Sequence, residues 1–305
     1  MPPSGDWRAA LDAVHDAAFA AVHEARVTVV IGASDAGKTT LVAALASELA
    51  SRGARVGVVD SDVGQSEIGP PTTVGLGRIL ARVARLSDSE LIAFQFVGVS
   101  SPARDIRGVV AAARRMVDRA RAERLERVLV DTSGLVLGWP GHLLKQRKIE
   151  AVDPDLLLVL EHDDECAPIV TRYAGLARPR VLRLQARGHP GSRSQTARRR
   201  HRALALDAYL REARPVILAW SAIALECPRG LDLSDSVGAV CGLGDAQGNT
   251  LALGIVEEVA PETLRVLAPI PRGALVTSAR IGRESSLGLP LGALPVPGRS
   301  ARLRT

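Results

Sequence analysis

Cysteine, lysine and aromatic residues are scarce in this sequence of 305 residues. The 3 cysteines, Cys166, Cys227 and Cys241, have no CxxC spacing and no nearby histidine pair, which excludes a disulfide framework and a zinc site and indicates a reducing cytoplasm. No run of about 18 uncharged apolar residues occurs, so no membrane span is expected, and the acidic opening segment is unlike a signal or transit peptide. With 47% apolar residues, the chain can form two globular domains.

Basic residues are abundant, but nearly all of them are arginine. Lys38, Lys145 and Lys148 are the only lysines among 39 Lys and Arg residues, which face 33 Asp and Glu residues for a net charge of +6. The excess is local, because the stretch from Arg172 to Arg214 holds 12 arginines and two acids. Such a segment indicates a polyanion partner, either nucleic acid or nucleotide phosphates. A solvated helix face or an arginine-rich source genome is the alternative.

A phosphate-binding motif occupies the segment GASDAGKTT, which fits GxxxxGK[ST] between an apolar run at 27–31 and a helical pattern at 39–50. The nucleotide-binding residues expected from it are Gly32, Ala33, Ser34, Asp35, Ala36, Gly37, Lys38, Thr39 and Thr40. The glycines let the backbone N–H groups wrap a pyrophosphate at the helix N-terminus. Lys38 is expected to reach the β and γ phosphates and Thr39 to bind Mg²⁺. A simple glycine-rich turn is the alternative.

Short apolar runs alternate with helical patterns along the first two thirds of the chain. Strands are expected at 27–31, 55–59, 91–97, 127–130, 156–160 and 181–184, and helices at 6–26, 39–50, 102–124, 142–151 and 167–174. This alternation predicts an α/β fold, a parallel P-loop NTPase sheet with helices on both faces. Closely spaced strand signals after residue 215 predict a smaller C-terminal β-rich domain. The expected parts are an N-terminal helix at 1–26, a P-loop domain at 27–214 that includes an Arg-rich lid at 188–214, and the β-rich domain at 215–305.

Acidic residues follow two of the expected strands. Asp60 and Asp62 come just after the strand at 55–59, and Asp131 ends the strand at 127–130. Because such strand ends lie beside the phosphate loop, these carboxylates are expected to face the γ-phosphate. There a carboxylate either supports the magnesium shell or accepts a proton from an attacking hydroxyl, and Asp131 is the more ordinary Walker B candidate. A solvated turn or a cap is the alternative for Asp60 and Asp62, and an Asx turn that leaves the sheet is the alternative for Asp131.

The expected nucleotide base is adenine, since neither exit from the late strands, EHDDE at 161–165 or QARG at 185–188, resembles the NKxD segment of guanine-binding proteins. Arg198 and Arg202 lie four residues apart on one helical face and can grip a transferring phosphoryl group, and Arg193 belongs to the same segment. An exposed helix that binds nothing is the alternative. Trp139, in a Gly/Pro-rich stretch, is a candidate for stacking on a substrate base, with core packing as its alternative.

Six blocks of the sequence, in order, resemble the polynucleotide 5′-hydroxyl kinases. That family includes the kinase subunit of the eukaryotic mRNA cleavage factor, the pre-ribosomal-RNA processing kinase and archaeal RNA kinases. The blocks are GASDAGKTT, VVDSDVGQSEIGPPTTVGLG, FVGVSSP, DTSGLVLGWPGHLLKQRKIEAVDPD, RSQTARRRHR and GLGDAQGNTLALGIVEEV. Because they extend over most of the chain, the resemblance is more specific than a P-loop alone.

The resemblance implies ATP-dependent transfer of the γ-phosphate to the 5′-hydroxyl end of RNA or DNA. By position it implies that Lys38 and Thr39 handle the γ-phosphate and Mg²⁺. It further implies that Asp62 is the general base, that Asp60 assists at the metal shell and that Gln65 helps to place the substrate.

The resemblance also implies that Arg198 and Arg202 are lid arginines. One position departs from the eukaryotic members, which have tryptophan after a Thr-x-Gly triplet to clasp the terminal base, whereas this chain has Leu135. Leucine cannot stack in the same way, and Trp139 four residues on is a candidate substitute.

The sequence therefore predicts a two-domain P-loop enzyme that uses ATP and Mg²⁺ to phosphorylate the 5′-hydroxyl end of RNA or DNA and contacts no membrane. Two alternatives remain open at this point. One is a non-catalytic nucleic-acid-binding scaffold that holds ATP as a structural ligand. The other is a P-loop GTPase or ATPase switch, whose strand-end carboxylates are similar.

Overall fold

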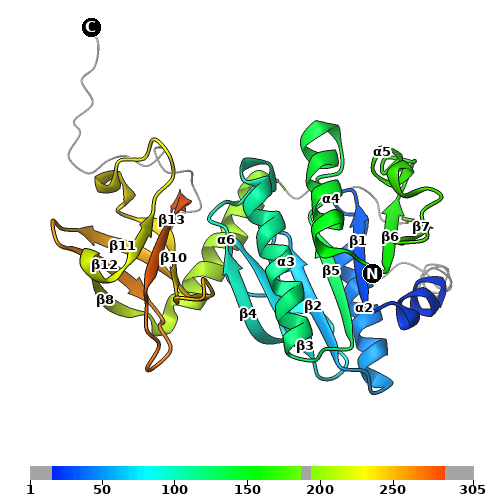
Figure 1. Cartoon of the computed structure of the whole chain (residues 1–305), viewed down its shortest axis with the longest axis horizontal. Helices are drawn as coiled ribbons and strands as arrows, with labels where there is room; N and C mark the ends of the chain where they lie inside the picture. Colours follow the sequence, from blue (N-terminus) through cyan, green and yellow to red (C-terminus); the bar gives the residue numbers. More distant parts are fainter. Residues whose placement is uncertain (1–15, 187–193, 286–305) are drawn as a thin grey trace, which may run out of the picture. The chain divides into compact units, whose positions relative to one another are not determined.

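The computed structural model describes residues 16–186 and 194–285, which form two compact units (Figure 1). The first unit consists of Met1–Val97 and Ser101–Arg193, and the second of Gly98–Ser100 and Ser194–Thr305. The helix expected to form the lid is thus grouped with the β-rich part, whereas the sequence pattern groups it with the P-loop domain. The physical reason is local, because Tyr209 at the end of that helix accepts a hydrogen bond from Leu253 N at 3.1 Å.

The first unit is built on a seven-stranded sheet, sheet A, with the order β4-β3-β2-β5-β1-β6-β7. Its strands are β1 (Val27–Gly32), β2 (Val56–Ser61), β3 (Thr73–Ile79), β4 (Glu90–Phe96), β5 (Arg127–Thr132), β6 (Leu156–Glu161) and β7 (Arg180–Gln185). The central pairs, from β2 to β7, are all parallel, which confirms the predicted fold class. Strand β3, which the sequence pattern did not predict, is antiparallel to both β2 and β4.

Strand β3 escaped prediction because two glycines, Gly75 and Gly77, interrupt its apolar run. Both are needed for close packing. A Cβ on Gly75 would lie 2.0 Å from the carbonyl oxygen of Ile68, and one on Gly77 would lie 2.3 Å from Ser89 Oγ. The two glycines therefore let Ile68, in the loop after β2, and Ser89, just before β4, approach the strand closely.

Helices cover both faces of sheet A. They are α2 (Lys38–Ser51), α3 (Ile106–Ala122), α4 (Gly138–Val152), α5 (Ala167–Val170) and a helical stretch at 16–24. The crossover from β1 to β2 runs in one direction along the strand order, and those from β4 to β5 and from β5 to β6 run in the other. Because such crossovers are right-handed, α2 lies on one face and α3 and α4 lie on the opposite face (Figure 1). Among the described residues, no helix is long and apolar enough to cross a membrane.

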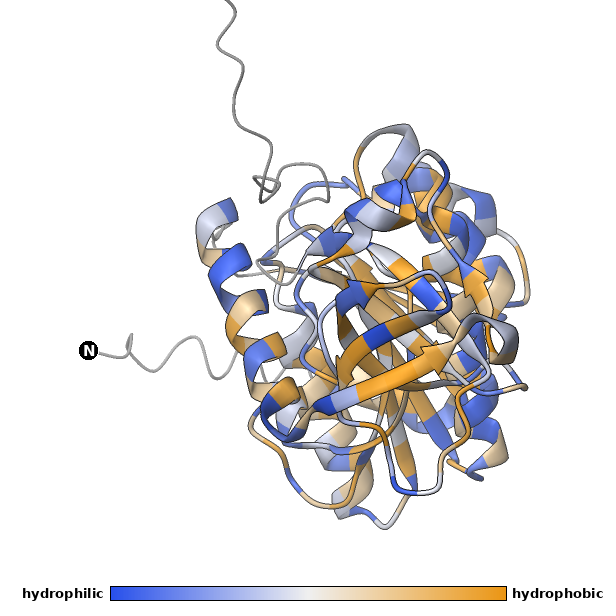
Figure 2. Ribbon diagram, turned by 90° about the vertical axis from the view of Figure 1, so that its left-hand side faces the viewer, coloured by the Kyte–Doolittle hydropathy of each residue, from blue (hydrophilic) through white to orange (hydrophobic). Residues whose placement is uncertain are grey.

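The core of the first unit lies between sheet A and its helices. Ala18 and Val22 of the helical stretch at 16–24 join one cluster with Leu45 of α2 and with Val58 and Leu129 of the sheet, which confirms that this stretch packs on the core. Figure 2 shows hydrophobic residues concentrated on the strands, while the helices carry hydrophilic residues as well. The central strands are buried on both faces, as expected for parallel strands.

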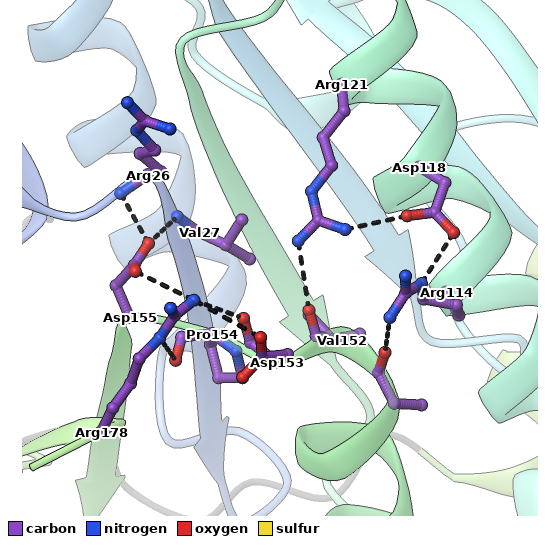
Figure 3. A network of polar contacts seen from close by, with 11 residues as sticks. Arg26, Val27, Arg114, Asp118, Arg121, Val152, Asp153, Pro154, Asp155 and Arg178 are labelled. Atoms are coloured by element: carbon purple, nitrogen blue, oxygen red, sulfur yellow. Dashed lines mark hydrogen bonds and ion pairs between the residues drawn. The ribbon is translucent and has the colours of Figure 1, made fainter.

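A polar network closes the amino-terminal edge of sheet A (Figure 3). Asp155 accepts hydrogen bonds from Arg26 N and Val27 N, both at 2.9 Å, and pairs with Arg178 at 3.1 Å. Arg114 of α3 donates to the Ala151 carbonyl at 2.6 Å near the end of α4. These contacts fix the starts of β1 and β6 and the end of α4 with exposed or half-buried side chains.

The second unit contains α6 (Gln195–Tyr209) and a six-stranded sheet, sheet B, with the order β8-β12-β11-β10-β13-β9. Its strands are β8 (Arg214–Ala219), β9 (Ala224–Glu226), β10 (Ala239–Gly244), β11 (Thr250–Val259), β12 (Thr263–Ala268) and β13 (Ser278–Ser285). The predicted hairpin is present, since β10 and β11 are antiparallel and Asp245 caps their turn by accepting from Gln247 N and Asn249 N. Short 3₁₀ turns occur in both units. Those of the first unit are Leu86–Asp88, Pro102–Arg104 and Thr171–Tyr173, and those of the second are Leu210–Glu212, Trp220–Ala222 and Leu233–Ser236.

Candidate active site

The loop between β1 and α2 has the conformation that its glycines predict. Gly37, at the N-cap of α2, has φ 92°, and Asp35 has φ 62°. The Nζ of Lys38 donates to the carbonyl oxygen of Ala33 at 2.7 Å, so the ammonium lies across the loop. Burial lowers the pKa of Lys38, while Asp131 and Asp62 oppose that shift. A lysine ammonium beside a loop that leads into a helix N-terminus is suited to hold the phosphates of a nucleotide.

Strand β5, the neighbour of β1 in sheet A, places the carboxylate of Asp131 at the start of α2. Thr39 Oγ1 donates to Asp131 Oδ2 at 2.6 Å. The other oxygen of this carboxylate, Oδ1, is buried and has no hydrogen-bond partner among the described residues. Burial raises the pKa of Asp131, and the Thr39 hydrogen bond and Lys38 oppose that shift. A hydroxyl and a carboxylate with an unused oxygen are ligands that fit Mg²⁺.

The segment after β5 lies directly against the phosphate loop. A Cβ on Gly134 would lie 2.3 Å from Ser34 Oγ and 2.5 Å from Ser34 N. Since β1 and β5 are neighbours and their following helices lie on opposite faces, this contact is at a switch point of the sheet, where nucleotides bind in such folds. The glycine of the Thr-Ser-Gly triplet is therefore fixed by the approach of two loops.

Asp60 organises the loop that follows β2. It lies inside the strand, paired with Asp131 of β5, and not just beyond the strand as the sequence pattern indicated. Its carboxylate accepts from Asp62 N at 3.0 Å, Glu67 N at 2.6 Å and Ile68 N at 3.1 Å. Burial, followed by the charge of Asp131, raises the pKa of Asp60 to about 8.

Asp62 is half-buried at the same edge. Its Oδ1 accepts from Gly64 N at 2.9 Å and Gln65 N at 3.2 Å, which fixes the orientation of the carboxylate. The charge of Asp62 acts on Lys38 and Asp131, so the acid lies within electrostatic reach of the phosphate loop. Lys38, Thr39, Asp131 and Asp62 therefore gather at the carboxyl edge of β1, β2 and β5.

Two residues of this edge were missed as site residues. Lys145 and Lys148 of α4 are both 0% exposed and lie within electrostatic reach of Asp62 and Asp131. Helical periodicity does not predict a buried lysine, because lysine is almost always a surface residue. The available signal was compositional, since every lysine of this arginine-rich chain lies at the same edge.

The other predicted site residues are one tryptophan and three arginines, and the structure describes all of them except Arg193. Trp139 lies in the first turn of α4 and not in a loop, and it is 72% exposed, so core packing is wrong as its alternative. Arg198 and Arg202 are half-buried on one face of α6. Arg193 lies outside the described residues. Arg198 and Arg202, which the sequence predicts to be lid arginines, belong to the second unit.

This strand, glycine-containing loop and helix, with Lys38 across the loop and a Thr39–Asp131 pair, define a P-loop nucleotide-binding protein. The family model described as mRNA cleavage and polyadenylation factor CLP1 P-loop matches residues 32–212. The chain belongs to this family, as the sequence blocks predicted.

Relatives with curated names agree with this assignment. A polyribonucleotide 5′-hydroxyl-kinase of Pyrococcus horikoshii is 42% identical over 144 residues, which cover 47% of this chain and 39% of that protein. One of Pyrococcus furiosus is 36% identical over 187 residues, which cover 61% of this chain and 51% of that protein. The chain thus matches about half, or less, of the length of these relatives.

Solved structures extend the likeness to the second unit. Clp1p in the wild-type Clp1p–Pcf11p complex matches with a TM-score of 0.73 over 93% of this chain and 80% of that one. The sequence identity is 14%, so this comparison shows the fold alone.

Proposed function

We propose that this chain is an ATP-dependent polynucleotide 5′-hydroxyl kinase that acts on RNA, with DNA as a further possible acceptor. The observation that carries the proposal is the convergence of Lys38, the Thr39–Asp131 pair and Asp62 at one edge of sheet A. The names of the Pyrococcus relatives support RNA as the acceptor. Adenine as the base follows from the lack of an NKxD-like segment.

The proposed reaction is an in-line transfer. The 5′-hydroxyl oxygen attacks the γ-phosphorus, the bond to the β–γ bridging oxygen breaks, and ADP leaves. The hydroxyl proton passes to Asp62, whose Oδ1 is held by Gly64 N and Gln65 N while Oδ2 accepts no hydrogen bond from the described residues. Lys38 moves from the Ala33 carbonyl to the β and γ phosphates and stabilises the charge that develops there.

Magnesium fits the Thr39–Asp131 pair, because Asp131 Oδ1 is buried with no partner in the described part of the chain and Thr39 Oγ1 is beside the same carboxylate. Among the described residues, no group of three or more His, Cys, Asp or Glu side chains could hold a metal by itself, so phosphate oxygens would complete the shell. A bound magnesium ion would neutralise charge on the β and γ phosphates. Asp60, whose oxygens already accept three N–H groups, would support this shell indirectly by holding the loop that carries Asp62.

Substrate contacts are assigned to residues around this centre. Gln65 follows Asp62 and would orient the 5′ end. Trp139 presents an indole that is 72% exposed, two residues after an exposed Leu137, and would stack on a terminal base in place of the tryptophan that Leu135 replaces. Arg198 and Arg202 would close on the transferring phosphoryl group, and Arg193 would bind the polynucleotide backbone.

The test is a transfer assay with γ-labelled ATP and matched RNA and DNA oligonucleotides that carry either a 5′-hydroxyl or a 5′-phosphate. Label is expected on the 5′-hydroxyl ends alone and only with Mg²⁺ present. Tight ATP retention without transfer would favour the scaffold alternative, and a response to GTP, or dimerisation on ATP, would favour the switch. Equal labelling of both ends, or of neither, contradicts the proposal.

Trp139→Ala serves as the variant for substrate binding. It is expected to raise the KM for RNA about tenfold, because stacking contributes about 1 to 3 kcal/mol per base. The kcat and the melting temperature should not change, since the indole is exposed. An unaltered KM for RNA would show that Trp139 does not contact the substrate.

A further inference from the structure

Two lysines of α4 are enclosed at the carboxyl edge of sheet A and have no part in the reaction proposed above. Lys145 and Lys148 are each 0% exposed and lie one helical turn apart. The amines of both side chains are engaged by groups at the strand ends. Any effect on the reaction must therefore come through the groups that they touch.

Lys148 holds the residue that precedes Asp62. Its Nζ donates to the Ser61 hydroxyl at 2.7 Å and lies 3.4 Å from the Ser61 carbonyl oxygen. The same hydroxyl donates to the Asp131 carbonyl oxygen at 2.6 Å. Lys148 thus fixes the last residue of β2 and, through it, the spacing of the two strands that carry Asp62 and Asp131.

Lys145 holds the residues that follow Asp131. Its Nζ donates to Thr132 Oγ1 at 2.8 Å and to the Ser133 carbonyl oxygen. Thr132 Oγ1 in turn donates to the Val30 carbonyl of β1 at 2.7 Å. Lys145 therefore fixes the segment between Asp131 and Gly134, which lies against the phosphate loop.

In the described part of the chain, the two side-chain amines donate only to neutral oxygens. Among residues 16–186 and 194–285, neither is within ion-pair distance of a carboxylate. Burial lowers the pKa of Lys148 to about 8, and Asp62, followed by Asp131 and Asp60, opposes that shift. Burial, followed by the charge of Lys148, lowers the pKa of Lys145 well below its ordinary value, and Asp62 and Asp131 oppose that shift. Both side chains thus lie within electrostatic reach of the carboxylates of Asp62 and Asp131.

The choice of lysine over arginine is informative in this chain. The chain has arginine at 36 of its 39 Lys and Arg positions, and its only lysines beside Lys38 are these two. An ammonium is compact and donates in three directions, so it can reach a hydroxyl and a carbonyl in one closed space, whereas a planar guanidinium needs a wider one. A compact amine with several donor directions therefore fits the enclosed contacts at this edge.

We propose that Lys145 and Lys148 are positioning residues for phosphoryl transfer. They hold the ends of β2 and β5 so that Asp62 and the Thr39–Asp131 pair converge on the γ-phosphate. The inference rests on the proposed kinase function and deepens it. Neither lysine donates to the phosphate loop itself, so their loss is expected to reduce the transfer step far more than nucleotide binding.

The experiment compares Lys145→Met and Lys148→Met with Arg114→Met, which removes a cation from the amino edge of the same sheet. For each full-length chain, the melting temperature, the Kd for Mg·ATP and the kcat and KM for labelled phosphate transfer to 5′-hydroxyl RNA are measured. The lysine variants are expected to lose about 100-fold in kcat with Kd within about threefold of wild type. Arg114→Met is expected to keep kcat within about twofold.

Lys148→Gln covers the case in which the methionine variants do not fold, because its amide can still donate to Ser61 without the charge. A smaller loss of kcat, about tenfold, is expected, because the amide keeps the hydrogen bond that positions Ser61. A folded lysine variant that keeps its kcat, or that loses ATP affinity as much as kcat, overturns the inference alone. A wild-type chain that transfers no phosphate overturns the proposed function as well, so the two failures are distinguishable.

Discussion

The charged side chains at the two edges of sheet A differ in their exposure to solvent. At the amino edge, Asp155 and Arg178 form an ion pair whose side chains are 32% and 51% exposed. At the carboxyl edge, Lys145, Lys148 and Asp131 are buried to within 2% of full enclosure. Exposed pairs cost little to form and contribute about 0 to 1 kcal/mol, whereas each buried charge costs several kcal/mol in lost hydration.

The difference separates stability from chemistry within one sheet. The amino-edge contacts tie β1, β6, α3 and α4 together and require no buried charge. The enclosed charges of the carboxyl edge lower the stability of the fold through lost hydration, and hydrophobic residues in their place would cost less free energy. Such an arrangement is consistent with a site that must stabilise moving charge, and variants at the two edges should separate the two roles.

The largest expected effect comes from Asp62→Asn, which removes the proposed base at the carboxyl edge and keeps its shape. The amide oxygen can still accept from Gly64 N and Gln65 N. Transfer should fall about 1,000-fold, as expected for loss of a general base, with ATP affinity unchanged. Single-turnover transfer and ATP titration measure the two quantities, and a variant with wild-type turnover would exclude Asp62 as the base.

Gly134→Ala should weaken ATP binding by about 100-fold, because its Cβ would overlap Ser34 of the phosphate loop. Gly254→Ala is the matched control, since its Cβ would lie 2.3 Å from Val266 Cγ1 in the second unit. The control should lower the melting temperature and leave the Kd for ATP in place. Equal loss of ATP affinity in both variants would show that the Gly134 effect is general unfolding.

Asp60→Asn tests the cost of the buried carboxyl edge through pH. The pKa of Asp60 is raised on folding from the ordinary 3.8 to about 8, so its contribution to stability is complete below about pH 4 and is lost as the pH rises through about 8. The stability of wild type should therefore fall relative to Asp60→Asn across this window, by on the order of a few kcal/mol. Urea unfolding at a series of pH values measures it, and parallel curves would contradict the assignment.

Asp155→Ala should have the smallest effect on activity. It removes an acceptor from Arg26 N and Val27 N, which should cost about 1 to 3 kcal/mol of unfolding free energy. The kcat at a temperature where the variant is folded should stay within about twofold of wild type. A large loss of kcat would end the distinction between the edges.

The sequence predicts those parts of the molecule whose structure depends on residues close together in the chain. The phosphate loop is continuous in sequence, and its strand and helix follow from an apolar run and a helical pattern. Strand β3 was missed because Gly75 and Gly77 weaken its signal, and their reason lies in contacts with Ile68 and Ser89.

Contacts between distant segments explain what could not be predicted at the site. The bonds from Lys148 to Ser61 and from Lys145 to Thr132 join α4 to two strands, and the sequence pattern gives no sign of them. Asp60 was predicted near the phosphates, but its hydrogen bonds to Glu67 N and Ile68 N depend on how the loop folds back. The roles of Asp62 and the lid arginines stay predictions.

The most direct test is a structure of the chain with a non-hydrolysable ATP analogue, Mg²⁺ and a 5′-hydroxyl RNA oligonucleotide. We expect a carboxylate oxygen of Asp62 within about 3.2 Å of the 5′ oxygen. The Nζ of Lys38 should have moved from the Ala33 carbonyl to the γ-phosphate, with Lys145 and Lys148 still on their strand-end partners. A bound 5′ end that contacts no carboxylate, with Asp62 directed away from the nucleotide, would contradict the account.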